Sequence, residues 1–208
     1  MARVTNNPYK PIAKEDLHKP VLFVVDMVNG FVKDGALADP AIQSCIAPIR
    51  SLIEEVQPTV WFVNDSHEAD AAEFAYFPPH CIKGTKEAEV VDELKEYVEN
   101  VIEKNAISAA SSMQFAAMLE TLEEEADLIV TGCCTDLCVL QLALPLRSWL
   151  NENNRKNSRV IVPLSCVETY DAKGVHGAEF WNEAALANLK ANGIDVVDSI
   201  QPVIGKEQ

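Results

Sequence analysis

The chain of 208 residues carries little positive charge. Its 17 Lys and Arg residues stand against 32 Asp and Glu residues, which gives a net charge of −15. Such a surface would repel a phosphate backbone, so we expect no nucleic-acid partner. The sequence also lacks an apolar run near the ~20 residues that cross a bilayer, and its N-terminal residues lack the apolar segment of a signal peptide. We therefore expect no membrane partner and a cytoplasmic location.

Paired cysteine spacing is missing as well. The six cysteines show neither the pattern of a disulfide scaffold nor that of a CxxC…CxxC zinc site. We expect reduced thiols, in agreement with a cytoplasmic location. The six are Cys45, Cys81, Cys133, Cys134, Cys138 and Cys166.

No internal repeat, low-complexity tract or Gly/Ser-rich linker divides the chain. Hydrophobic residues make up 48% and charged residues 24%, the composition of a globular protein rather than of a disordered one. A chain of this length buries roughly 70% of its unfolded surface and needs no disulfide or structural metal to fold. We expect a single domain over residues 1–208.

Short apolar runs alternate with segments of helical periodicity. This alternation predicts an α/β fold, a six-stranded parallel sheet with helices on both faces in a doubly wound arrangement. Ligands of such sheets lie at the carboxyl ends of the strands. The predicted strands are 20–26, 59–64, 100–104, 127–131, 159–163 and 195–198, and the predicted helices are 41–56, 88–98, 113–124, 137–153 and 178–192.

Residues 65–85 show no clear period, and a loop this long in a compact domain is usually functional. Asp65 and His67 follow the second predicted strand directly, and Glu73 and His80 lie further along the loop. Single histidines in loops are most often surface residues. Two histidines with an aspartate at a strand end favour a site for Zn²⁺, Mn²⁺ or Fe²⁺ with positions left open.

Three reactive groups lie at or after the carboxyl ends of other predicted strands. Asp26 closes the first strand, Lys104 closes the third, and Cys138 lies in the turn and first helical turn after the strand 127–131. Charges at strand ends commonly point to solvent. If the three converge, however, Asp26 could take the thiol proton and Lys104 could keep that carboxylate charged, while the helix start lowers the thiol pKa.

The segments VLFVVDMVNGFV, EKNAISA and VTGCCTDLCVLQLAL, in this order and spacing, resemble the three catalytic segments of the isochorismatase-like cysteine hydrolases. The likeness covers nearly the whole chain. NDSHEA followed by FPPHCIKGT resembles the metal loop that distinguishes nicotinamidases, also called pyrazinamidases, within that superfamily.

The resemblance implies a role for each matching residue. Cys138 would be the nucleophile, Asp26 the proton acceptor and Lys104 the third member of the triad. A non-proline cis peptide would join Cys133 to Cys134, turning the backbone N–H groups of Cys134 and Cys138 toward the oxyanion. The implied metal ligands are Asp65, His67 and His80, together with Glu73, which matches an acidic ligand found in some nicotinamidases, while others use a histidine.

The resemblance also covers the pocket around the reacting groups. One divalent ion would bind the pyridine nitrogen of the substrate. Zn²⁺ is the preferred candidate for this ion, with Mn²⁺ and Fe²⁺ as alternatives. Phe31 and Phe77 match aromatic positions that sandwich the pyridine ring, although core packing would explain them equally. Two departures are Ile107, where an aromatic residue is frequent, and Cys133, where Val is usual. His176 is interpreted as structural.

These patterns favour a metal-dependent amidase that converts nicotinamide to nicotinate and ammonia through a cysteine thioester. A sibling hydrolase acting on another small amide or carbamoyl compound is the nearest alternative, and it would not need the metal. A non-catalytic thiol and metal-binding protein is a third hypothesis, which the presence of Asp26, Lys104 and Cys138 together disfavours. Family members are monomers, dimers or larger, so a homo-oligomer remains open.

Overall fold

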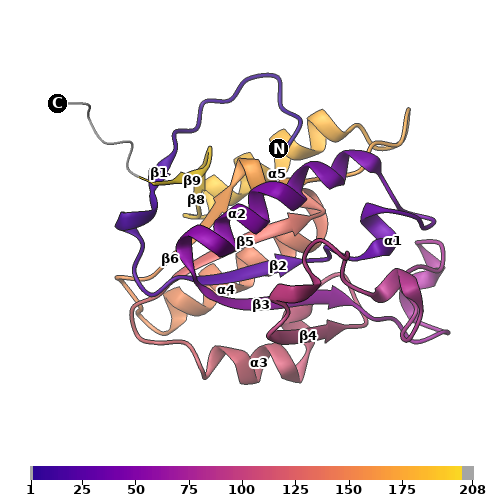
Figure 1. Ribbon diagram of the computed structural model, residues 1–208, viewed down its shortest axis with the longest axis horizontal. Helices are drawn as coiled ribbons and strands as arrows, with labels where there is room; N and C mark the ends of the chain where they lie inside the picture. Colours follow the sequence, from indigo (N-terminus) through magenta and orange to yellow (C-terminus); the bar gives the residue numbers. More distant parts are fainter. Residues whose placement is uncertain (1, 203–208) are drawn as a thin grey trace.

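The structure is a computed structural model that describes residues 2–202. Its centre is a sheet in which every pair of described strands is parallel, as predicted. The main strand order is β4-β3-β2-β5-β6-β8, and the arrowheads of β2, β3 and β4 point to the same end of the molecule (Figure 1). These strands are β2 (Val21–Val25), β3 (Thr59–Asp65), β4 (Asn100–Lys104), β5 (Asp127–Cys133), β6 (Arg159–Pro163) and β8 (Asp195–Val197).

The number of strands differs from the six expected. The two-residue strand β7 (Val167–Glu168) pairs with the end of β5, at Gly132 and Cys133, and adds a seventh strand to the sheet. A separate two-stranded sheet joins β1 (Ile12–Ala13) to β9 (Ile200–Gln201). Strands this short carry no readable period in the sequence.

Helices cover both faces of the sheet because successive strand side chains point to opposite sides. Phe23 and Val25 of β2 pack with Phe115, Leu142 and Leu189 on one side, whereas Leu22 and Val24 pack with helix α2 on the other. The first layer holds α3 (Met113–Leu119), α4 (Leu140–Glu152) and α5 (Ala178–Ala191); the second holds α1 (Asn29–Val32) and α2 (Ile46–Val56).

The predicted helix over 88–98 is wrong. The backbone there is instead tied to the loop after β2, since Asn29 N–H donates to Glu89 O and Val91 N–H donates to Met27 O. These bonds replace the internal ones a helix needs. Only 3₁₀ turns form, at Lys86–Ala88 and Lys95–Tyr97, while the apolar period reflects burial of Val90, Val91 and Leu94.

Three other predicted helices are shorter than expected. Residues 40–45 form a 3₁₀ turn before α2, and α3 ends at Leu119 rather than at residue 124. The segment that leads into α4, Thr135–Val139, is a π-helical turn. The sequence predicted Cys138 in the first turn of an α-helix. The structure instead places it in this wider turn.

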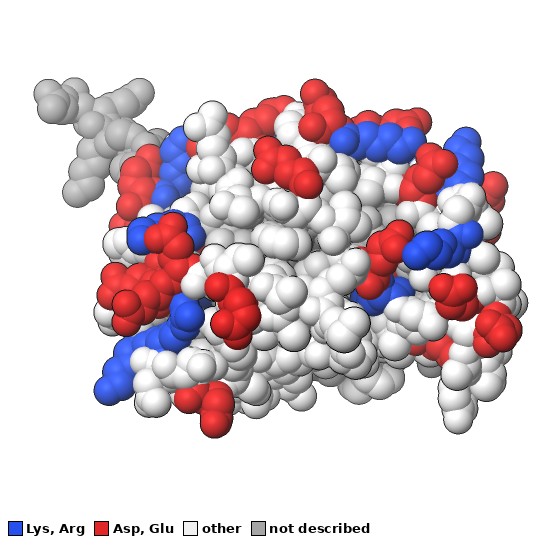
Figure 2. All heavy atoms as spheres, turned by 90° about the horizontal axis from the view of Figure 1, so that it is seen from below, with Lys and Arg blue, Asp and Glu red and all other residues white. Residues whose placement is uncertain are grey.

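No helix among residues 2–202 combines the length and the apolar character needed to cross a bilayer. Acidic and basic side chains lie interspersed on the face shown in Figure 2. Some acidic side chains are paired with lysines, as in Lys83–Glu103 and Lys95–Asp92, whereas the net charge of −15 comes from the acidic residues in excess of the basic ones.

Candidate active site

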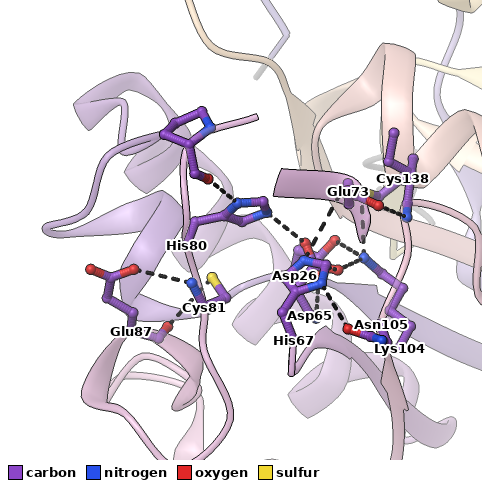
Figure 3. Close-up of polar contacts among 12 residues, drawn as sticks. Asp26, Asp65, His67, Glu73, His80, Cys81, Glu87, Lys104, Asn105 and Cys138 are labelled. Atoms are coloured by element: carbon purple, nitrogen blue, oxygen red, sulfur yellow. Dashed lines mark hydrogen bonds and ion pairs between the residues drawn. The ribbon is translucent and has the colours of Figure 1, made fainter. Parts of the chain in front are cut away.

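Three groups predicted from separate segments converge at the carboxyl end of the sheet (Figure 3). The Lys104 Nζ lies 2.8 Å from Asp26 Oδ2 and 3.5 Å from Cys138 Sγ. Asp26 follows β2, Lys104 ends β4, and Cys138 follows β5. Since parallel strands end at one edge of the sheet, the fold itself brings these groups together.

Asp65, at the end of β3, joins the same cluster. Lys104 donates to Asp65 Oδ1, and the Asp65 N–H donates to Asp26 Oδ1 at 2.7 Å. Asp26, Asp65 and Lys104 are each at most 3% exposed. Burying one such charge alone is costly, so a single ammonium shared by two carboxylates is the arrangement that keeps all three groups ionised.

Burial dominates the acid–base properties of the reacting pair. It raises the pKa of Asp26 to about 6, with the nearby Asp65 carboxylate adding to the effect. Burial also raises the pKa of Cys138 well above its ordinary value, and Lys104 offsets this only in part. The lowered thiol pKa expected from the helix start is therefore not found. A raised thiol pKa favours the protonated form, so a base would have to remove the thiol proton before Cys138 could react.

Asp65 and Lys104 show the opposite balance. Burial acts to raise the pKa of Asp65, but Lys104 and the two histidines outweigh it and hold that pKa well below its usual range. Burial likewise opposes the charge of Lys104, and Asp26 and Asp65 raise its pKa well above the ordinary value. Both groups stay charged near neutral pH.

The two loop histidines lie against Asp65 as the metal hypothesis requires. One donor atom from each of Asp65, His67 and His80 lies within 4.8 Å of the other two, and all three residues are buried. The His67 Nε2 is 3.4 Å from Asp65 Oδ1, and the His80 Nε2 is 3.6 Å from Asp65 Oδ2. Imidazole and carboxylate donors are ligands that Zn²⁺, Mn²⁺ and Fe²⁺ accept.

The Nδ1 atoms of these two histidines contact other oxygen atoms of the protein. His80 Nδ1 donates to the Pro78 carbonyl at 2.8 Å, and His67 Nδ1 lies 3.3 Å from Asn105 Oδ1. Each Nε2 is then left to face Asp65, and the buried His67 Nε2 has no hydrogen-bond partner among the described residues. Lone pairs that converge on a carboxylate fit a bound cation, so the residues present fit a divalent metal ion.

Glu73 lies beside this group rather than within it. One of its oxygens is 4.0 Å from His67 Nε2, and the other accepts a hydrogen bond from the Ile107 N–H at 2.9 Å. The Ile107 bond holds the loop against the segment after β4. Sequence reasoning missed Asn105, although its position directly after Lys104 at a strand end was an available signal.

A small pocket lined by both Cys138 and His80 connects the thiol to one of the two histidines. Phe31 and Phe77 both line it, with ring centroids 5.4 Å and 6.4 Å from that of His80. Tyr170, after β7, also lines it and was not singled out in the sequence, because no periodic element contains it. The other apolar walls are Leu37, Ile107 and Leu137.

The turn that carries Cys138 begins with an unusual backbone. The Cys133–Cys134 peptide bond is cis, as predicted. Gly132 precedes it with a φ of 104°, and a Cβ at this position would lie 1.9 Å from the Val25 carbonyl oxygen. Only glycine permits this approach of β5 to β2. Cys134 and Cys138 both line the pocket.

The fold and this cluster define a class of protein. Residues 20–201 match the family model of the isochorismatase domain, so the chain belongs to the isochorismatase family.

Particular relatives are similar over most of the chain. Nicotinamidase 1 of Arabidopsis thaliana is 28% identical, with 86% of this chain and 85% of that protein covered. The crystal structure of nicotinamidase PncA from Bacillus subtilis matches with a TM-score of 0.67 and 26% identity, covering 86% of this chain and 99% of that one. The crystal structure of N-carbamoylsarcosine amidase from Thermoplasma acidophilum matches with a TM-score of 0.65 and 26% identity. The match covers 92% of this chain and 100% of that one.

Proposed function

We propose that this pocket hydrolyses nicotinamide to nicotinate and ammonia, as a metal-dependent amidase. The observation that carries the proposal is the position of Asp65, which contacts Lys104 on one side and the two histidines on the other. A nucleophile group and a metal-ligand group thus share one pocket with aromatic walls. The similarity to nicotinamidases supports the choice of substrate.

Cys138 acts as the nucleophile on the carboxamide carbon. Asp26 takes the thiol proton as the carbon–sulfur bond forms, and Lys104 keeps the Asp26 carboxylate charged and oriented. The backbone N–H groups of Cys134 and Cys138 stabilise the oxyanion. Asp26 then returns its proton to the leaving nitrogen, so that ammonia departs and a thioester with Cys138 remains.

The second half of the reaction restores the enzyme. Asp26 takes a proton from water, the resulting hydroxide attacks the thioester, and nicotinate leaves as the Cys138 thiol is protonated again. Asp65, His67 and His80 would hold a divalent ion, with Glu73, 4.0 Å from His67, as a further ligand candidate. When bound, the ion would supply a Lewis-acidic position for the ring nitrogen. Phe31 and Phe77 would flank the ring.

Ammonia release from nicotinamide tests this proposal, measured with and without a chelator. Loss of release on chelation, with recovery after addition of Zn²⁺, Mn²⁺ or Fe²⁺, is expected. No release with metal present would overturn the proposal. A second candidate would then be favoured, a hydrolase of another small amide or carbamoyl compound, which the similarity to N-carbamoylsarcosine amidase supports.

A further inference from the structure

Behind the Cys138 turn lies a second polar cluster that the proposed reaction does not use. Asp136, two residues before Cys138, has a side chain that is 5% exposed. Its Oδ1 accepts a hydrogen bond from Thr169 Oγ1 at 2.5 Å, and its Oδ2 lies 2.8 Å from His176 Nε2. Asp136 therefore ties the nucleophile turn to the segment between β7 and α5.

His176 is held at both ring nitrogens. Its Nδ1 lies 3.0 Å from the Tyr170 carbonyl oxygen, and its Nε2 faces the Asp136 carboxylate. Contacts at both nitrogens, on opposite sides of the ring, fix the plane of the His176 ring.

That fixed ring supports the side chain of Tyr170. The Tyr170 and His176 rings stack with centroids 3.9 Å apart and planes 13° apart. Trp181 stacks on His176 at 5.3 Å and 8°. The His176 ring is therefore stacked between two aromatic rings, a favourable arrangement for planar side chains. Tyr170 in turn lines the active-site pocket beside Cys134, Leu137 and Cys138.

We propose that Tyr170 is a specificity-determining wall of the pocket, and that Asp136 and His176 are positioning residues that hold its ring in place. The wall selects planar aromatic amides over aliphatic ones of similar size, since Tyr170 contributes an aromatic side chain to the pocket lining whereas Ile107 contributes an aliphatic one. This inference rests on the proposed amide hydrolysis. It adds a substrate contact from Tyr170, which enters the pocket lining from the segment after β7.

Steady-state kinetics with nicotinamide test the wall. Tyr170→Leu removes the flat ring and is expected to raise KM roughly fivefold while kcat changes much less, because aromatic contacts are worth about 0.5–1.5 kcal/mol. Tyr170→Phe keeps the ring and should leave KM near the wild-type value. An unchanged KM in Tyr170→Leu would overturn the proposal.

The positioning role is tested with His176→Gln, which removes the stacked ring but keeps polar groups. We expect KM to rise in the same direction as in Tyr170→Leu, with kcat again little affected. His18→Gln, at an exposed histidine, is the matched control. A lower melting temperature in His176→Gln with an unchanged KM would show a merely structural role and would overturn this part.

A readout independent of turnover separates this proposal from the proposed function. If the wild-type protein with metal releases no ammonia from nicotinamide, the proposed function fails. The rate at which iodoacetamide alkylates Cys138, followed by mass spectrometry, still reports on the wall. Tyr170→Leu and His176→Gln should be alkylated faster than wild type and Tyr170→Phe at the wild-type rate, whereas equal rates in all four proteins would overturn the proposal.

Discussion

The ammonium of Lys104 lies 3.5 Å from the sulfur of Cys138, although 34 residues separate them in the chain. The same ammonium is held by Asp26 and Asp65. Lys104, at the end of β4, therefore stabilises the negative charges of Asp26 after β2 and Asp65 at the end of β3. From the same position its ammonium approaches the thiol. Any negative charge that develops on the sulfur as it loses its proton is partly balanced in place.

Removal of the thiol tests the nucleophile. Cys138→Ala is expected to lower kcat for ammonia release by at least about 10⁴-fold, because loss of a nucleophile removes a whole covalent pathway. Its metal content should stay near that of wild type, since the ligand set is untouched. Cys45→Ala, at a buried cysteine outside the pocket, is the control. Substantial residual turnover in Cys138→Ala would contradict the assignment.

Removal of one proposed ligand tests the metal group. His80→Ala should lose bound metal and raise KM for nicotinamide by about tenfold or more, since even indirect changes around a metal cost that much. The rate at which iodoacetamide alkylates Cys138 should change by a smaller factor than KM does in this variant. Metal content by elemental analysis and KM are the measurements, with His18→Ala as the control. An unchanged KM would count against a substrate held at the metal.

Lys104 is expected to be a large stabilising contributor. Lys104→Met removes the ammonium that contacts both the Asp26 and the Asp65 carboxylates, which should lower the free energy of unfolding by about 3–5 kcal/mol. The surface pair control, Lys95→Met, should cost no more than about 1 kcal/mol. Denaturant unfolding measures both. In the double variant Lys104→Met/Asp26→Asn, part of the loss should return, because one unpaired charge is removed.

Gly132 is expected to tolerate no side chain. Gly132→Ala places a Cβ 1.9 Å from the Val25 carbonyl oxygen and at a φ of 104°, so we expect a loss of at least about 3 kcal/mol in the free energy of unfolding. Gly177→Ala is the matched control, since no atom lies within 4 Å of the added Cβ and its φ is ordinary. Equal stability of the two variants would contradict the close approach of β5 to β2.

Asp39 gives a pH-dependent contribution to stability. Burial acts to raise its pKa, but the N–H groups of Ala41 and Asp171 and the Arg3 guanidinium outweigh it and lower the pKa below 3.8. Its contribution is therefore present above pH 3.8 and lost as the pH falls through the lower folded-state value. Asp39→Ala should be less stable than wild type by about 1 kcal/mol at neutral pH. The difference should shrink in acid, whereas a constant difference would contradict this account.

Much of the fold could be predicted because its strands are buried on both faces. All five residues of β2 are buried, and such continuous apolar runs are readable without tertiary information. The segment 88–98 misled the prediction because its apolar residues are buried through bonds to the loop after β2, which only the folded chain contains. β7 was too short to show a pattern.

The candidate site divides in the same way. The convergence of Asp26, Lys104 and Cys138 could be predicted because each lies at or shortly after the carboxyl end of a strand in one parallel sheet. The raised pKa of Cys138 could not, because it depends on burial rather than on position at a helix start. The environment of His176 was equally hidden, since Asp136 and Tyr170 reach it from segments 40 and 6 residues away.

The pairing of β3 with β4 sets Asp65 directly opposite Lys104. Because side chains alternate along a strand, inserting or deleting a single residue in β4 would turn Lys104 to the other face of the sheet. The hydrogen-bonded register of β3 and β4 therefore sets the distance between Asp65 and Lys104. Changes of length in the loop between Asp65 and His80 would alter the positions of the proposed metal ligands yet leave that register intact. The proposed metal site can therefore diverge in this architecture while Cys138, Lys104 and Asp26 stay in place.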